Sequence, residues 1–366
     1  MALHLHRAAR TDQLADQLGE LLASPLSDPF AAEVVVVPAK GVERWLSQRL
    51  SHRLGAAPGA EDGVCAGVEF LHPASLISLL LGRDRDDPWH PDQLVWPLLA
   101  TIDESLGESW CAALSAHLGH GLTGEEGALR QSRRWSVARR LAELFASYAA
   151  QRPALVEAWA ANDDTDGTGT ALAEDLRWEA ELWRRLLPRV GTETPDARHR
   201  RVCEELRAGG DALDLPGRLS LFGHTRLPAT EIELLGALAE TRDVHLWLAQ
   251  PSAALWHAAA QTAPAGSTGR PRDEDTSATL ASHPLLASLG RDARELATVL
   301  GPVATASDVS APDPATPDSL LGWLQADMRA NTAPTPEARA GRVVARSDNS
   351  LQVHCLLYTS PSPRDS

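Results

Sequence analysis

The stretch that most constrains the fold is "EVVVVPAKGVERWL", residues 33–46, because it contains four valines in a row. Consecutive apolar residues of high strand propensity are typical of a strand that is covered on both faces, as inside a parallel sheet. The following segment, residues 41–54, repeats apolar residues at helical spacing. A buried strand, a short loop and a helix predict that the chain opens as an α/β domain.

The same patterns continue along the chain. Residues 2–6 alternate and predict a strand, followed by a helix with leucines at positions 14, 18, 21 and 22. From about 73 to 216, one segment after another has helical apolar spacing. Strands return at 218–222 and 243–248, with a helical segment at 229–240 between them. The pattern predicts an α/β, parallel-sheet domain interrupted by a large helical insertion.

The last third of the chain mixes one helix with polar segments. Residues 283–300 have helical apolar spacing and predict a single helix. Residues 350–355 predict the start of another strand, and we interpret residues 355–366 as a foreign tail because their composition differs from the rest. The Pro- and Gly-rich remainder predicts a flexible loop and two connectors, at residues 261–282, 304–318 and 330–340.

The loop after the valines lies where a nucleotide-binding protein would hold phosphates. A working P-loop has the pattern GxxxxGK[ST], in which backbone N–H groups surround the phosphates, the lysine neutralises charge and the hydroxyl binds Mg²⁺. Here Lys40 precedes Gly41, no glycine comes earlier in the loop, and no Ser or Thr follows at the required place. The strand at 218–222 ends in Gly223 and His224 instead of a Mg²⁺-binding acid. We therefore expect no ATP hydrolysis by this chain.

The charge of the chain restricts how it could bind nucleic acid. The formal net charge is −15, so the average surface repels phosphates, and any contact needs a local basic stripe. Two Arg-rich segments, residues 130–140 with Trp135 and residues 184–202, could bind phosphates and stack bases. The alternative is that helices in a protein with a single lysine, Lys40, carry Arg-rich faces in any case. Both interpretations stay open.

Other patterns favour structural roles. None of the four cysteines has CxxC spacing, which argues against a zinc ribbon or a disulfide framework. The segment "NDDTDG", residues 162–167, resembles the start of a calcium loop, but position 173 lacks the closing Glu, so a solvated turn is favoured. His4 and His6 share one face of a strand and are interpreted as structural. With neither a signal peptide nor an apolar run of ~18 residues, we expect a cytoplasmic protein without membrane contact.

Eight segments occur along the chain in a characteristic order: "SDPFAAEVVVVPAKGVERWLSQRL", "GVCAGVEFLHPASLI", "LVWPLL", "RRLAELFASYAAQRP", "LWRRL", "RLSLFGHTRLP", "DVHLWLAQPS" and "HPLLASLGRDARE". In this order they resemble the start of the RecC family, the gamma chains of exodeoxyribonuclease V, the RecBCD helicase–nuclease. The resemblance extends to about residue 354. Because members of the family are far longer, it implies an N-terminal fragment.

The resemblance implies a P-loop-NTPase-like fold, that of a superfamily 1 helicase with a degenerate ATP site. It implies a helicase-like domain at 1–75 and 216–303, a helical insertion at 76–215, and a linker with the start of another helicase-like domain at 304–354. The implied role is non-catalytic: lining the channel for the unwound 3′ strand, scanning it for the Chi signal and supporting RecB-like and RecD-like subunits. These partners would use ATP and Mg²⁺, whereas this chain would hold no cofactor and would contact double-stranded DNA ends and single-stranded DNA.

By position, the resemblance implies specific DNA contacts. We expect Lys40, Arg44 and Arg152 to meet phosphates or base edges, and Glu143 either to accept from a base amine or to orient an arginine. Trp45 is expected in the core, on the apolar face of its helix. The complete expected set is Lys40, Arg44, His72, Glu143, Leu144 and Arg152. Two other functions remain open: an active helicase or nuclease subunit of the AddB type, and a helical interaction protein that does not contact DNA.

Overall fold

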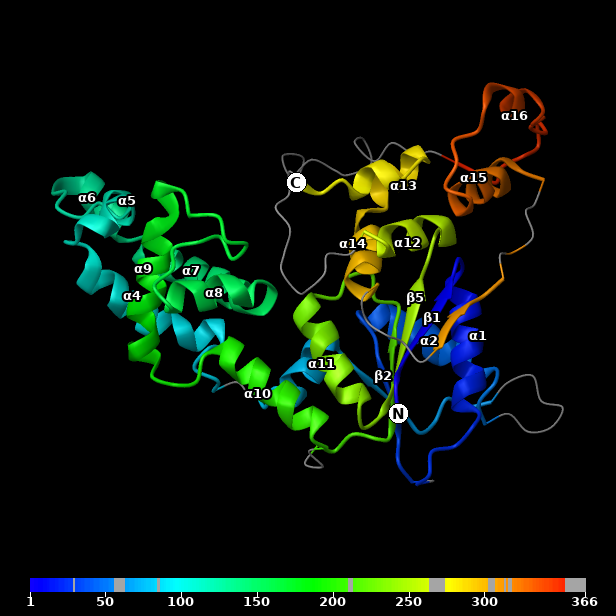
Figure 1. The fold of residues 1–366 in the computed structure, drawn as a ribbon, viewed down its shortest axis with the longest axis horizontal. Coiled ribbons are helices and arrows are strands. Elements are labelled where there is room, and N and C mark those ends of the chain that lie inside the picture. Colours follow the sequence, from blue (N-terminus) through cyan, green and yellow to red (C-terminus); the bar gives the residue numbers. More distant parts are fainter. Residues whose placement is uncertain are drawn as a thin grey trace, which may run out of the picture.

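The computed structural model describes residues 1–28, 30–55, 63–83, 86–209, 213–262, 274–301, 307–312, 314 and 318–352. Its centre is a parallel sheet of six strands in the order β3-β2-β4-β5-β1-β6 (Figure 1). The expectation of an α/β fold with a parallel sheet is confirmed, although the sequence predicted neither β3 nor β6. The strands are β1 (Leu3–Ala8), β2 (Glu33–Val36), β3 (Val68–Leu71), β4 (Arg218–Phe222), β5 (Asp243–Ala249) and β6 (Ser307–Ser310).

Strand β2 lies inside the sheet, paired with β3 on one side and β4 on the other. Successive valines of the run 34–37 point to opposite faces of the sheet. Val34 and Val36 join one apolar core cluster, while Val35 and Val37 join another. All four are at most 5% exposed. Burying a side chain of this size contributes roughly 1.5–3 kcal/mol. The prediction that both faces of this strand are covered is confirmed.

Helices cover both faces of the sheet. On one face, α1 (Thr11–Leu22) and α2 (Lys40–Ser51) bury leucines against the side of β2 that carries Val35. The result is a helix–sheet–helix arrangement of three layers. The helices that bury residues on the opposite face are α3 (Pro73–Leu80), α10 (Pro195–Arg207), α11 (Ala229–Ala239), α12 (Ala253–Ala260) and α14 (Arg291–Leu300).

Most of the chain between β3 and β4, residues 91–190, forms a helical lobe with an apolar core of its own, on the left of Figure 1. Phe145, Trp159 and Trp183 lie in this core and are at most 2% exposed. The predicted run of helices is confirmed, while the exact domain boundaries stay a prediction. The helices of the lobe are α4 (Pro91–Ser105), α5 (Ala112–His117), α6 (Gly124–Gln131), α7 (Arg134–Gln151), α8 (Pro153–Ala160) and α9 (Arg177–Val190), with short 3₁₀ helices at Ser109–Cys111 and Glu174–Leu176.

Residues 283–300 form two helices, so the prediction of a single helix is wrong. Helix α13 (Pro284–Leu289) ends at Gly290, whose φ of −83° and ψ of 16° leave the helical region, and α14 begins at once. A Cβ at Gly290 would lie 2.5 Å from the carbonyl oxygen of Leu286, so only glycine allows a turn this tight. Apolar spacing continues across the break, and for that reason periodicity did not reveal it.

Three polar segments hold more structure than the sequence predicted. Within the expected connector at 304–318, β6 pairs with β1 and extends the sheet. Within 330–340, α16 (Pro336–Ala340) forms a short helix, preceded by α15 (Leu320–Arg329). In the expected loop at 261–282, Ser277–Leu280 is a 3₁₀ helix, while residues 263–273 lie outside the described residues. Backbone pairing defines β6, and side-chain periodicity does not report such pairing.

The predicted strand at 350–355 begins at the limit of the described residues. Residues 350–352 are not in a strand, and residues 353–366, which include the predicted foreign tail, lie outside the described part. Within the ranges that the structure describes, no helix combines the length and apolar character needed to cross a membrane.

Candidate nucleic-acid interface

The sheet brings the segments that follow β2, β3 and β4 to one edge, because these strands are neighbours and parallel. Open α/β sheets bind ligands outside this carboxyl edge. Lys40 follows β2 and His72 follows β3, while Gly223 and His224 follow β4. A Cβ at Gly223, where φ is +76°, would lie 3.8 Å from a methyl group of Val42 in α2. The end of β4 therefore lies against the start of α2.

Lys40 does not face a phosphate cradle. It is the first residue of α2, and its Nζ donates to Glu43 at 2.8 and 3.1 Å, with 89% of the lysine side chain exposed. The residue before it, Ala39, provides no side-chain cap for the helix. The ammonium group is thus paired with a carboxylate of its own helix, and the loop lacks the glycines that let backbone N–H groups surround phosphates.

Arg44 is exposed and makes no hydrogen bond or ion pair within the described part of the chain. It lines an open cavity of about 610 Å³ between α2 and β3, together with Ser47 and Phe70. An exposed guanidinium without a carboxylate partner is available to a phosphate. Among the expected contact residues on α2, Arg44 suits that role best.

The expectation that Trp45 lies in the core is wrong. Its side chain is 39% exposed, and its ring centroid is 6.2 Å from that of Phe222. Helix α2 packs on the sheet through Leu46 and Leu50, both fully buried. Trp45 precedes Leu46 by one residue, a rotation of about 100° around the helix, which places it at the border of the buried face.

Two histidines lie near each other at the carboxyl edge. His72 caps α3, its Nδ1 accepting from the amide of Ala74 at 3.2 Å, and it is exposed. His224 is 5% exposed, and neither ring nitrogen has a hydrogen-bond partner in the described residues. Burial and the nearby His72 lower the pKa of His224 to about 4. A neutral imidazole therefore follows β4, and it offers no carboxylate to a Mg²⁺ ion at this edge.

The remaining expected residues lie on α7 in the helical lobe. Glu143 is 3.5 Å from Arg139 and 3.4 Å from Arg140, and Leu144 packs half-buried against the core of the lobe. Arg152 follows α7 and donates to the carbonyl oxygen of Asp166 at 2.6 Å. In the described part of the chain, no hydrogen bond or ion pair joins these three residues to Lys40 or Arg44. The expected residues thus form two separate groups.

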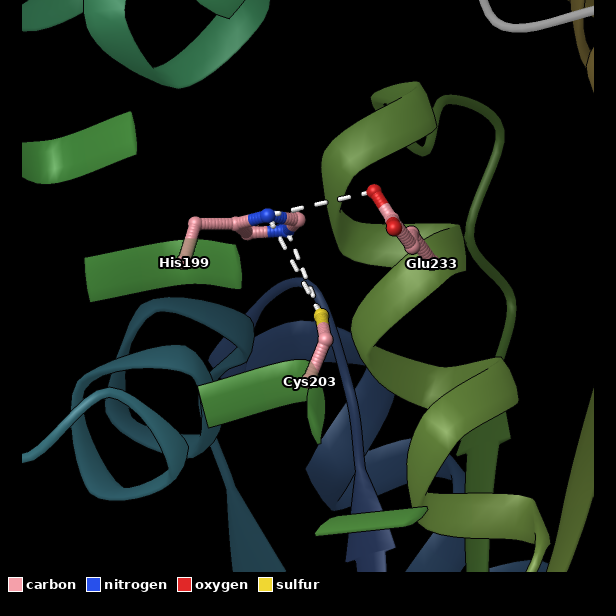
Figure 2. A group of neighbouring side chains, drawn as sticks. All are labelled: His199, Cys203 and Glu233. Carbon is pink, nitrogen blue, oxygen red and sulfur yellow. Dashed lines mark hydrogen bonds and ion pairs between the residues drawn. The ribbon is translucent and has the colours of Figure 1, made fainter. Parts of the chain in front are cut away.

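One cluster of side chains has the chemistry of a metal site, and the sequence analysis did not find it (Figure 2). It comprises His199 and Cys203 of α10 and Glu233 of α11, with donor atoms within 4.8 Å of one another. The spacing of four between His199 and Cys203 was a signal available in the sequence. Glu233 comes from another helix, so only the tertiary structure brings it to the pair.

The "NDDTDG" segment and the histidines of β1 could have been metal sites by residue type, but their side chains are used in contacts within the fold. Asp166 of the "NDDTDG" segment accepts from the amides of Thr168 and Thr170, at 2.8 and 3.2 Å, which supports a turn. The ring of His6 stacks on those of Trp247 and His245, with centroids 3.8 and 5.3 Å apart. Burial lowers the pKa of His6 to about 4. These contacts support the structural interpretation of both patterns.

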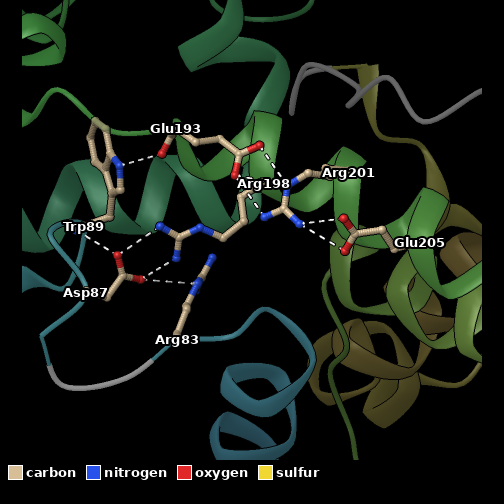
Figure 3. A network of polar contacts seen from close by, with 7 residues as sticks. All are labelled: Arg83, Asp87, Trp89, Glu193, Arg198, Arg201 and Glu205. Carbon is tan, nitrogen blue, oxygen red and sulfur yellow. Dashed lines mark hydrogen bonds and ion pairs between the residues drawn. The ribbon is translucent and has the colours of Figure 1, made fainter. Parts of the chain in front are cut away.

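The Arg-rich segment at 184–202 is neutralised by carboxylates. Arg198 binds the buried Asp87, and Arg201 lies between Glu193 and Glu205 (Figure 3). The other arginines of the segment, Arg184, Arg185, Arg189 and Arg200, are also paired with Asp or Glu. In the segment at 130–140, Arg139 and Arg140 share Glu143, while the guanidinium of Arg133 has no carboxylate partner in the described residues. The structural interpretation holds for the segment at 184–202, whereas the segment at 130–140 retains positive charge that no carboxylate neutralises.

Comparison with known proteins gives the family. The family model described as RecC, N-terminal domain, matches residues 3–331 of the 366-residue chain. The chain belongs to the RecC family. It is similar to the RecBCD enzyme subunit RecC of Mycobacterium tuberculosis, with 55% identity over 356 residues, and to that of Mycolicibacterium smegmatis, with 54% over 364 residues. The same subunit of Escherichia coli K12 is 25% identical over 336 residues.

Each match covers most of this chain but only a small part of the relative. The two mycobacterial matches cover 97% of this RecC-family chain but 31% and 30% of the relatives, and the Escherichia coli match covers 83% of the chain and 28% of the relative. The chain therefore spans less than a third of the length of these curated relatives. The family resemblance expected from the eight sequence segments is confirmed.

Two neighbouring tryptophans are exposed on the helical lobe of this RecC-family chain. The sequence analysis pointed to Trp135 but not to Trp96. Trp96 of α4 is 60% exposed, Trp135 of α7 is 43% exposed, and their ring centroids are 4.7 Å apart. Exposed tryptophans are suited to stacking on bases or to burial in a protein interface. Trp96 falls outside the 3–4 spacing of the buried leucines of α4, and this departure was the available signal.

Proposed function

We propose that this chain is part of a non-catalytic DNA-binding and scaffold subunit of an ATP-dependent exodeoxyribonuclease V. Its similarity to proteins named RecBCD enzyme subunit RecC supports that assembly. In this proposal the chain acts in the cytoplasm, in double-strand break repair by recombination, beside RecB-like and RecD-like subunits that use ATP and Mg²⁺. The chain itself performs no chemistry.

The observation that carries the proposal is the chemistry of the carboxyl edge of the sheet. Lys40 is paired with Glu43, the loop before it lacks glycine, and the buried neutral His224 follows β4. A triphosphate and its Mg²⁺ would find neither a cradle of backbone N–H groups nor an acid there. This chemistry supports a P-loop-NTPase-like, superfamily 1 helicase-like domain whose ATP site is degenerate.

The proposal also divides the chain into the domains of a superfamily 1 helicase. Residues 1–75 and 216–303 form the helicase-like α/β domain, and residues 76–215 form the helical insertion. Residues 304–354 lead toward a second helicase-like domain, after β6 (Ser307–Ser310) has extended the first sheet. The separate apolar core of the helical lobe supports this division.

Two groups of basic residues would guide the unwound 3′ strand while it is scanned for the Chi signal. Arg44 is exposed without a carboxylate partner in the described residues, and Arg152 follows α7 at the end of the lobe nearest the sheet. Thr230, near the start of α11, donates to Ala150 at 2.7 Å and so ties this end of α7 to the segment after β4. In this proposal the unwound strand contacts Arg44 and Arg152 one after the other.

Nucleotide occupancy tests the degenerate site. In the assembled complex, a photoreactive azido-ATP is expected to label the motor subunits and to leave this chain unlabelled. Label on this chain that Mg²⁺ strengthens and Lys40→Ala removes would contradict the proposal. That result would favour the alternative, an active helicase or nuclease subunit of the AddB type.

DNA affinity tests the arginines. Binding of the complex to a 3′-tailed duplex is measured over a series of salt concentrations for Arg44→Ala and Arg152→Ala. Each variant is expected to bind more weakly, with the salt slope lowered by about one if the arginine contacts a phosphate. Arg201→Ala is the matched control, because Glu193 and Glu205 already neutralise Arg201. Unchanged slopes in both test variants would favour an interaction protein that does not contact DNA.

A further inference from the structure

Three side chains that the proposed function does not use converge between α10 and α11 (Figure 2). His199 and Cys203 are one helical turn apart on α10, so both face Glu233 on α11. His199 is 8% and Cys203 is 1% exposed, whereas the side chain of Glu233 is 48% exposed. The cluster is therefore enclosed on one side and open to solvent on the other.

The imidazole of His199 is held in one orientation. Its Nε2 lies 2.9 Å from the carbonyl oxygen of Thr230. A carbonyl oxygen can only accept, so Nε2 carries the proton, and in the neutral ring Nδ1 presents a lone pair. A carboxylate oxygen of Glu233 lies 3.8 Å from this Nδ1. Histidines that bind metals commonly donate their other ring N–H to a backbone carbonyl in this way, which fixes the tautomer.

The donor atoms lie slightly farther apart than the ligands of a small divalent cation would, so binding would draw them inward. Bonds of about 2.3 Å to sulfur and 2.0 Å to nitrogen place tetrahedral donors about 3.5 Å apart. Sγ of Cys203 lies 4.0 Å from Nδ1 and 3.9 Å from Nε2 of His199, so the thiol now packs against the ring. To bind one cation with the other two donors, Sγ must move from the ring face toward Nδ1, and the half-exposed Glu233 must move slightly.

We propose that His199, Cys203 and Glu233 form a site for Zn²⁺, with water as the fourth ligand on the open side. Thiolate and imidazole donors favour Zn²⁺ over Mg²⁺ and Ca²⁺, which prefer oxygen. When the metal binds, the S–H bond of Cys203 breaks, its proton passes to water and a metal–sulfur bond forms without a change of oxidation state. Arg207 lies 3.6 Å from the other oxygen of Glu233 and leaves the oxygen nearest His199 available.

The metal would cross-link two helices of one layer. Helices α10 and α11 both bury residues in the core on the face of the sheet that carries Val34. A cation held by both helices limits their relative movement. Because its ligands come together only in the folded chain, its binding free energy also stabilises the fold.

Cobalt binding by the full chain, after removal of metal with a chelator, tests the site. The parent protein is expected to bind one equivalent of Co²⁺ with a thiolate-to-cobalt charge-transfer absorption, which Zn²⁺ displaces. Cys203→Ser should abolish the absorption, and Glu233→Gln should weaken binding at least tenfold. Cys111→Ser is the matched control, since Cys111 is equally buried but lies in the core of the helical lobe; it should bind like the parent.

Several results would overturn the site. They are a parent protein without the absorption, a Cys203→Ser variant that keeps it, and equal loss in Cys111→Ser. Glu233→Gln alters a half-exposed carboxylate and stays informative if Cys203→Ser does not fold. If Glu233→Gln keeps both the affinity for Co²⁺ and the rise of Tm with Zn²⁺, the three-ligand site is wrong. None of these variants changes Arg44 or Arg152, so such a failure leaves the proposed DNA-binding function untouched.

Discussion

At the scale of single residues, arginines with the same chemistry perform two tasks. Arg198 donates to Asp87 at 2.7 and 3.1 Å, and the Asp87 side chain is only 5% exposed (Figure 3). Burial by itself raises the pKa of Asp87, but hydrogen bonds from Arg198 and from the amide of Trp89 hold that pKa below its ordinary value. Arg44, in contrast, has no partner in the described part of the chain. Sequence spacing cannot distinguish the two, because the partner of Arg198 is 111 residues away.

Removing Arg198 should destabilise the fold strongly. Arg198→Ala leaves the buried Asp87 with only Arg83, 3.9 Å away, and the amide of Trp89, and we expect the free energy of unfolding in urea at pH 7 to fall by about 3 kcal/mol. Arg201→Ala removes an exposed arginine, and we expect a loss below about 1 kcal/mol. Since the pKa of Asp87 is lowered on folding, its stabilising effect is present at neutral pH and is lost as the pH falls through the folded pKa. Similar losses in the two variants would contradict this account.

His224 should make stability depend on pH. Its pKa is lowered to about 4 on folding, from about 6.5 in the unfolded chain. As the pH falls, the unfolded chain takes up the proton first, so the contribution of the neutral ring is complete above about pH 6.5 and declines toward pH 4. Between pH 7 and pH 5 we expect the parent to lose about 2 kcal/mol more than His224→Asn in urea titrations. Parallel losses would show that the ring does not stay neutral in the folded chain.

At the scale of elements, the sequence predicted those whose packing follows side-chain periodicity. Strands β1, β2, β4 and β5 and the helices beside them were predicted because each alternates or repeats apolar residues toward a core. Strand β6 was missed because backbone pairing with β1 defines it. The break between α13 and α14 was missed because it depends on one glycine inside a continuous apolar pattern.

The break at Gly290 can be tested with a matched pair of glycines. Gly290→Ala places a methyl group 2.5 Å from the carbonyl oxygen of Leu286, and we expect a loss of about 1–3 kcal/mol in thermal unfolding. Gly236 lies inside α11, where a Cβ meets nothing within 4 Å, so Gly236→Ala should raise stability by about 0.4–1 kcal/mol. If Gly290→Ala is neutral, the two helices can join without strain.

At the scale of the whole molecule, the described chain has one apolar core in the helical lobe and two against the faces of the sheet. Phe145 and Trp183 meet edge to face in the core of the lobe, with ring centroids 5.4 Å apart. Leu246 belongs to one of the sheet cores. Because the lobe and the sheet share few buried residues, their stabilities should respond separately to core mutations.

Hydrogen exchange measured by mass spectrometry should resolve this separation. Phe145→Ala, which should cost about 3–5 kcal/mol, is expected to speed amide exchange in α4, α7 and α9 at least a hundredfold. Exchange in β2, β4 and β5 should stay within a few-fold of the parent. Leu246→Ala is the reciprocal control and should speed exchange in the strands. Equal acceleration in both parts for either variant would show a single cooperative unit.

The sequence by itself determined the layered α/β core, the run of helices and the weak chemistry of the loop at Lys40. Each depends on residues close in sequence, whose spacing or motif is visible without a fold. Only the tertiary structure decided that Trp45 is partly exposed, that the arginines of 184–202 are neutralised, and that Glu233 meets His199 and Cys203. These outcomes depend on which surfaces of separate helices come together, because burial and charge pairing are properties of that contact and not of spacing along the chain.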